Sequence, residues 1–179
     1  MSQVNATNSL SQIMADIDLG PSGSIQFLFA KLQLAQSQIC KNQAESYMKQ
    51  IETIQEEQKA CADMIERARK LQNDAKNGTG DCSWDKNASV MPDDMVKFFE
   101  DRNISFESTG GDGDYVHNAD EWDYNLKSLT NYQEQIGNKT QTLMIYLQDF
   151  IGQYNSYQEG AMSAISSATQ TLRSVARGQ

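Results

Sequence analysis

The sequence predicts an all-α protein: a long antiparallel two-helix coiled coil with a small mixed α/β insert between the helices. Apolar side chains recur at alternating steps of four and three residues in two long segments, near 25–76 and 122–175. The stretch between them is rich in Gly, Asp, Asn and Ser and lacks that period. A repeat that averages 3.5 residues stays on one side of a helix only if the helix supercoils with a partner, so each long helix requires another.

The first long helix is expected over residues 24–76. It follows a turn-rich cluster, residues 18–24, whose last residue, Ser24, is the expected N-cap. The apolar stripe keeps its steps from 28 to 39 and again from 47 to 68, and two steps of four through Gln43 join the two parts. Such a stutter locally relaxes a supercoil. The segment contains no Pro and no Gly, so no residue in it breaks the helix.

The insert is expected over residues 77–121. Asn77 to Gly80 should end the first helix. Pro92, which is followed by two Asp residues, predicts a short helix near 92–101 with this proline at the first helical position. Residues 104–106 and 115–116 are expected to form a short hairpin around 109–113.

The second long helix is expected over residues 122–177. Its apolar seam begins at Trp122 and shrinks to alanines toward the C-terminus. Gly137, Gly152 and Gly160 each cost about 1 kcal/mol relative to Ala in a helix interior, so we expect this helix to be only partly ordered alone. The residues expected at coiled-coil or oligomer contacts on the two helices are Leu28, Leu32, Ile39, Tyr47, Ile51, Ile54, Ile65, Leu126, Leu129, Ile136, Leu143, Leu147, Phe150, Tyr154, Tyr157, Ile165 and Leu172.

Residues 1–23 are expected to form a flexible polar tail. The first residues have neither a positive region nor an apolar core, which predicts no ordinary secretory signal. No stretch of the chain reaches the roughly 20 apolar residues that a transmembrane segment needs. The chain carries 24 acidic and 15 basic residues. Because binding to phosphate groups needs clustered cations, this balance argues against nucleic acid as a partner.

The sequence predicts no catalytic, cofactor or metal site, and we expect the protein not to be an enzyme. His117 is the only histidine, and no nucleophile or orienting group accompanies it in the sequence. Residues 112–114 resemble the start of a calcium loop, but the sixth and twelfth positions lack the Gly and Glu that such a loop uses. Cys40, Cys61 and Cys82 do not have the spacing of a zinc site and are expected to be small buried residues.

Three stretches of the sequence resemble one known family. Residues 29–63, FAKLQLAQSQICKNQAESYMKQIETIQEEQKACAD, are similar to its Gln/Ala-rich first helix, and residues 91–106, MPDDMVKFFEDRNISF, to its Pro-Asp-Asp segment. Residues 138–165, NKTQTLMIYLQDFIGQYNSYQEGAMSAI, are similar to its C-terminal helix. The family is the EspA/SseB family of extracellular filament proteins, the hydrophilic translocators of bacterial type III secretion systems.

This resemblance implies a protein that is exported unfolded through the secretion channel and polymerises outside the bacterium. The polar tail would then contain the export signal. The polymer would be a homo-oligomer, a hollow helical filament that extends the secretion needle toward a host membrane for effector delivery. Pore-forming translocators would act at that membrane, and a cytosolic chaperone would cover the apolar seams before export. The expected location is secreted, at the bacterial cell surface.

Two other functions fit the same pattern. A needle-tip protein of the same secretion class would form a small closed ring. Tip proteins usually carry a larger insert between the helices, so the short stretch 77–121 favours the filament. A cytosolic coiled-coil adaptor or chaperone would bind a partner helix through its seam and would not appear in the culture medium.

Overall fold

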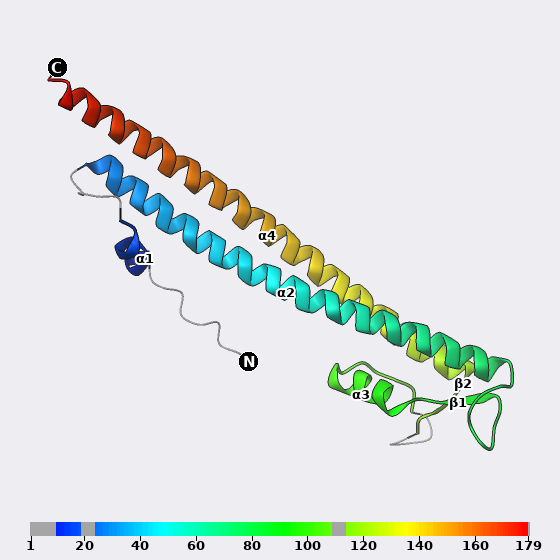
Figure 1. The fold of residues 1–179 in the computed structure, drawn as a ribbon. Helices are drawn as coiled ribbons and strands as arrows, with labels where there is room; N and C mark the ends of the chain where they lie inside the picture. Colours follow the sequence, from blue (N-terminus) through cyan, green and yellow to red (C-terminus); the bar gives the residue numbers. More distant parts are fainter. Residues whose placement is uncertain (1–9, 19–23, 109–113, 179) are drawn as a thin grey trace. The chain divides into compact units, whose positions relative to one another are not determined.

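The computed structural model describes residues 10–18, 24–108 and 114–178. These ranges are mostly helical, as the sequence predicts (Figure 1). Residues 1–9 of the expected tail, residues 19–23 of the expected turn cluster, the expected hairpin turn at 109–113 and residue 179 lie outside them. The elements in chain order are α1 (Leu10–Asp16), α2 (Ile25–Lys76), β1 (Ala88–Val90), α3 (Asp93–Asp101), β2 (Val116–Asn118) and α4 (Ala119–Ala176).

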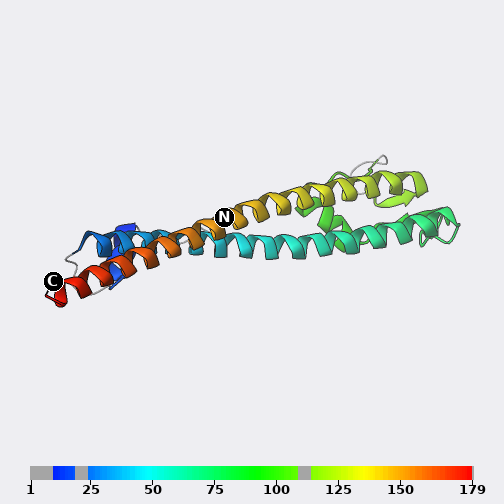
Figure 2. The ribbon, with the colours of Figure 1, turned by 90° about the horizontal axis from the view of Figure 1, so that it is seen from above.

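The described residues divide into two compact units. Unit 1 combines the described residues up to 51 with those from 142 onward, and unit 2 comprises residues 52–141. The long helices α2 and α4 each contribute one segment to each unit. In both units the α2 segment lies beside an α4 segment that runs in the opposite direction (Figures 1 and 2).

The start and end of α2 are fixed by local hydrogen bonds. The backbone N–H of Phe27 donates to Ser24 Oγ at 3.3 Å, so Ser24 caps the helix as its sequence position predicts. At the other end Gly78 has a φ of +69°, and Thr79 N–H donates to Asp74 C=O at 2.9 Å. This left-handed glycine with a six-to-one hydrogen bond is a Schellman cap, which satisfies the last carbonyls of the helix.

The short helix α3 closes in a similar way but begins one residue later than expected. Pro92 is its N-cap, with φ −65° and ψ 148°, whereas the sequence predicted this proline at the first helical position. The extended ψ takes Pro92 out of the helix, while its carbonyl still accepts hydrogen bonds from the N–H groups of Met95 and Val96. After the helix, Asn103 has a φ of 52°, and Ile104 N–H donates to Phe99 C=O at 2.8 Å.

One of the two strands of the insert is not the one that the sequence predicted, because β2 includes Val116 of the expected segment 115–116 but its partner is β1. β1 pairs with β2 in an antiparallel register that places Ser89 opposite His117, so the first strand lies before α3. The expected hairpin between 104–106 and 115–116 is wrong. Ile104 is buried and its N–H is used to close α3, so this segment packs as an irregular piece of core.

The helix α4 begins three residues before the expected position, at Ala119. Asn118 Oδ1 accepts hydrogen bonds from the N–H groups of Asp120 and Glu121 at 2.9 and 3.0 Å. Glu121 Oε2 in turn accepts from Asn118 N–H at 2.8 Å. This reciprocal capping box starts the helix and connects it directly to β2.

Unit 2 contains a well-packed apolar core. α3 carries Met95, Val96, Phe98 and Phe99 on one buried face and contributes them to this core. An ion pair between Arg67 and Asp94, with N–O distances of 2.5 and 2.9 Å, joins the outer side of α3 to α2. The buried residues of the core are Cys61, Ile65, Ala68, Ala75, Met91, Met95, Val96, Phe98, Phe99, Ile104, Trp122, Leu129 and Ile136.

Candidate assembly surface

In unit 1 the α2 residues with side-chain contacts to α4, namely Ser37, Cys40 and Tyr47, belong to one continuous row. Ser37, Cys40, Ala44, Tyr47 and Ile51 follow one another at steps of three and four, and all except the half-buried Tyr47 are buried. The row therefore contains no stutter, contrary to the sequence expectation. The expectation followed Ile39 and Gln43 between residues 39 and 47, whereas the buried residues there are Cys40 and Ala44.

Polar contacts lie within this helix pair. Gln158 Nε2 donates to Ser37 Oγ at 2.9 Å, and Cys40 Sγ lies 3.7 Å from Gln153 Oε1. Farther along α2, Tyr47 stacks on Phe150 with ring centroids 5.6 Å apart. Paired polar side chains at seam positions specify the register of two helices, because a shift would leave them buried without partners.

The structure places the sequence-predicted residues of α2 in three environments. Ile51 and Ile65 are buried, and Leu28 is exposed near the start of the helix. The remaining four are half-buried: Leu32, Ile39, Tyr47 and Ile54.

The predicted residues of α4 divide similarly. Leu129, Ile136 and Leu143 are buried, and Leu172 near the end of the helix is exposed. The half-buried ones are Leu126, Leu147, Phe150, Tyr154, Tyr157 and Ile165.

A second apolar row on α4 was missed by the sequence analysis as a separate feature. Met144, Ile151, Ile165 and Leu172 are spaced by seven, fourteen and seven residues, and the polar Gln158 occupies the intermediate position. We call these four apolar residues the outer row. Three of them are exposed and Ile165 is half-buried. The seven-residue spacing is visible in the sequence, but the sequence analysis followed only the neighbouring seam.

Exposed apolar side chains are concentrated in unit 1. Besides the outer row, Ile145 is 65% exposed and Met162 is 70% exposed. Of the large hydrophobic residues exposed in the described chain, only Trp84 and Tyr124 belong to unit 2. Unit 2 thus encloses its apolar residues, whereas unit 1 leaves many of them in solvent. Large exposed apolar patches are typical of interaction surfaces.

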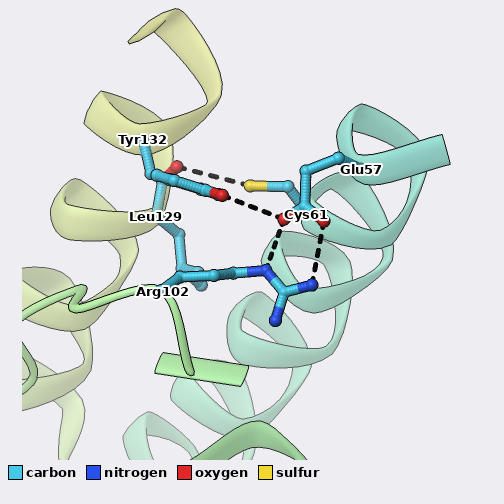
Figure 3. Close-up of polar contacts among 5 residues, drawn as sticks. All are labelled: Glu57, Cys61, Arg102, Leu129 and Tyr132. Atoms are coloured by element: carbon cyan, nitrogen blue, oxygen red, sulfur yellow. Dashed lines mark hydrogen bonds and ion pairs between the residues drawn. The ribbon is translucent and has the colours of Figure 1, made fainter. Parts of the chain in front are cut away.

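A polar cluster connects α2, α3 and α4 within unit 2 (Figure 3). Arg102, which follows α3, binds the Glu57 carboxylate through Nε and also through Nη2, the latter at 2.9 Å. Tyr132 Oη donates to Glu57 Oε1 at 3.0 Å. One turn along α2, Cys61 Sγ donates to the Leu129 carbonyl at 3.5 Å. The contacts drawn in Figure 3 therefore link α2 to α4 and to the residue that follows α3.

The ionisation of this cluster follows from its contacts. The hydrogen bond from Arg102 lowers the pKa of Glu57 below its usual value. Burial raises the pKa of the Cys61 thiol to about 11, so the thiol is protonated and unreactive at neutral pH. Burial also raises the pKa of Tyr132. A nucleophile or general base needs the opposite tuning, so the cluster is structural.

The histidine and the three cysteines that the sequence analysis considered for catalysis or metal binding are also buried in packing positions. His117 is buried beside Trp122, with ring centroids 5.2 Å apart, and burial lowers its pKa. The three cysteines are buried and unpaired. Within the described ranges, no three His, Cys, Asp or Glu side chains are grouped as a metal site would require. No helix among the described residues is both long and apolar enough to cross a membrane.

Comparisons with protein-family models, with curated proteins and with solved structures found no match to this chain.

Proposed function

We propose that this protein is the structural subunit of an extracellular filament of a type III secretion system. The subunits polymerise into a hollow conduit that extends the needle and delivers effectors toward a host membrane. The sequence resemblance over residues 29–63, 91–106 and 138–165 supports this proposal. The helix pair of α2 and α4 and the distribution of exposed apolar residues support it independently.

In this proposal α2 and α4 form an antiparallel coiled coil. The alternating steps of three and four on α2 continue from unit 1 into unit 2 through Ile54, Gln58 and Cys61. In unit 2 the polar pair of Gln58 Nε2 and Thr140 Oγ1, at 3.5 Å, lies between the two helices as Ser37 and Gln158 do in unit 1. Sustained seam spacing with polar layers is typical of coiled coils with a defined register.

The observation that carries the proposal is the outer row on α4. It lies one residue after Leu143 and Phe150 of the seam, at the flanking position of the heptad. An α-helix with a seam and an apolar flanking position presents apolar side chains to two neighbours. α2 is one neighbour, and a helix of another copy is the second. Repetition of such a contact between identical subunits leads to a ring or a filament.

The charge distribution suits the same arrangement. Of the 24 acidic and 15 basic residues, 19 and 10 lie in residues 52–141, so unit 2 carries the whole net charge of −9. Unit 1 contains five of each and is neutral. Copies that associate through unit 1 avoid electrostatic repulsion, while an acidic unit 2 keeps the assembly soluble.

Negative-stain electron microscopy and sedimentation velocity of the purified full chain test this function. We expect long hollow filaments of uniform width at high protein concentration. Closed rings would instead support a needle-tip protein, and a stable small oligomer that is never secreted would support a cytosolic adaptor. Either result would overturn the filament.

A matched pair of variants tests the role of the outer row. Ile151→Glu places a charge in the row, whereas Ser156→Glu places the same charge on an exposed polar position of α4 five residues away. We expect Ile151→Glu to prevent assembly and to leave the helix content of the single chain unchanged. Ser156→Glu should assemble like the wild type. Equal assembly of both variants would remove the outer row from the proposal.

A further inference from the structure

Trp84 is a solvent-exposed residue on a loop that is closed by hydrogen bonds. Its side chain is 78% exposed, in the segment between α2 and β1. Gly80 N–H donates to the Lys86 carbonyl at 2.9 Å, and Lys86 Nζ donates back to the Gly80 carbonyl at 3.2 Å. Val90 N–H donates to Asp81 Oδ1 at 2.8 Å. These bonds close the loop without any contribution from the indole.

The other tryptophan, Trp122, differs from Trp84 because its side chain is part of the packed core. Trp122 has no exposed surface and belongs to the core of unit 2. A large aromatic side chain that a closed loop presents to water is instead typical of an anchor at a protein interface, where tryptophan is the most enriched residue.

Unit 1 contains an apolar groove of about 470 Å³. Ile25 and Phe29 from the first turns of α2 form one wall, and both are exposed. Gly160, which has no side chain, and Ala164, which has only a methyl group, line the groove from α4. Because Ala164 is short, the groove has room for a side chain from outside, although Gln33 occupies the space beside Gly160, where an added Cβ would lie 3.2 Å from Gln33 Oε1. The remaining lining residues are Gln26, Ser163 and Ser167.

The charges around the two features are complementary. Residues 24–44 and 160–178, which contain the groove, carry Lys31, Lys41, Arg173 and Arg177, and the carboxylates Glu45 and Glu159 directly border these ranges. Asp81 and Asp85 flank Trp84 in sequence, and both are exposed. Both aspartates lie in unit 2, which carries the whole net negative charge of the chain. Opposite charges around a contact favour the encounter and fix its orientation.

We propose that Trp84 of one copy inserts into this groove of a second copy. The inference rests on the proposed self-assembly and adds that one end of a subunit binds a different part of the next subunit. The inserting residue follows the last turn of α2, and the groove lies at the first turns of α2. The contact therefore joins two different surfaces, and a pair that makes it once leaves one of each free. Such a heterologous contact extends into an open helical polymer unless its geometry closes a ring.

Two variants, each with a matched control, test the contact by sedimentation velocity. Trp84→Ala removes the inserted side chain, and Tyr124→Ala removes another exposed aromatic residue of unit 2 as its control. Ser167→Glu places a carboxylate in the groove, and Ser166→Glu places it on the neighbouring exposed residue, which does not line the groove. We expect the first member of each pair to raise the concentration needed for assembly by about 30-fold, the loss typical of an interface anchor. The controls should assemble like the wild type.

A mixture of the two variants, each also carrying Ile151→Glu to disable the outer row, isolates this contact. The Trp84→Ala chain keeps the groove, and the Ser167→Glu chain keeps the tryptophan. We expect titration of a fluorescently labelled Trp84→Ala chain with the Ser167→Glu chain to saturate at one to one, whereas neither chain binds itself at the same concentration. Absence of this complex would overturn the insertion of Trp84 even if the wild type polymerises. Formation of the complex by a protein that never forms filaments would overturn the filament and keep the contact.

Discussion

The guanidinium carbon of Arg102 lies 3.9 Å from the centre of the Phe98 ring, while the same guanidinium binds the Glu57 carboxylate. Phe98 belongs to the buried face of α3, and Glu57 belongs to α2. One side chain thus joins the cap of the short helix to the long helix. This contact explains why α3 packs against the helix pair within unit 2.

We predict that Arg102→Ala lowers the free energy of unfolding by about 2 kcal/mol, between the values for exposed and buried ion pairs, because it leaves Glu57 partly buried without its partner. Arg102→Lys should give an intermediate loss, since an ammonium cannot bind both carboxylate oxygens in the same way. Urea unfolding followed by circular dichroism measures both. Arg69→Ala, at an exposed position of α2, is the control and should change stability by less than about 0.5 kcal/mol. Equal losses for Arg69→Ala and Arg102→Ala would contradict a structural role for the cluster.

His117 predicts acid sensitivity of unit 2. Burial lowers its pKa in the folded state, and Glu121, Asp114 and Glu107 oppose that shift only in part. Because the unfolded chain binds the proton more readily, stability should fall as the pH drops below about 6.5, the ordinary histidine value, toward the lowered folded value. His117→Gln should remove this part of the pH dependence, as measured by thermal unfolding between pH 7 and 5. The same slope in the wild type and the variant would refute the assignment.

Two glycines should respond oppositely to alanine. A Cβ on Gly80 would lie 2.0 Å from the carbonyl oxygen of Ala88, so Gly80→Ala must displace the backbone of the loop that carries Trp84. A Cβ on Gly152 of α4 meets no atom within 4 Å. Gly152→Ala should therefore stabilise the chain by about 1 kcal/mol through helix propensity, whereas Gly80→Ala should destabilise it. Thermal unfolding of the two variants provides the comparison, and a stabilising Gly80→Ala would contradict the close approach.

The sequence predicted the helical class because the period of three and four persists over two long segments. It predicted Ser24 as a cap for a different reason, because a helix start is determined by a few neighbouring residues. The capping box of Asn118 and Glu121 was equally local and was missed because the seam itself begins only at Trp122. Helix ends are therefore readable when the cap is examined separately from the apolar pattern.

The strands were not predictable from local sequence. β1 has three residues, and its pairing with β2 spans the whole of α3. Ile104 and Phe106 have the β propensity that suggested a strand, but their burial against α3 decides their conformation. The partner of Glu57 was also hidden, because 45 residues separate it from Arg102 and only the packing of α3 brings them together.

The seam of unit 1 yields the last prediction. Leu147 is half-buried on α4, between the buried Leu143 and Phe150, which stacks on Tyr47. We expect Leu147→Asp to loosen this helix pair by about 2 kcal/mol, because it brings an unpaired charge against apolar neighbours, and to abolish polymerisation.

Gln148→Asp introduces the same charge at the adjacent exposed position and serves as the control. It should reduce neither the helix signal nor filament length. Circular dichroism of the dilute chains reports the helix pair, and electron microscopy of the concentrated chains reports the polymer. Filaments of normal length from Leu147→Asp would show that assembly does not depend on the pairing of α2 with α4 in unit 1, and the coiled coil would then lose its place in the proposed filament.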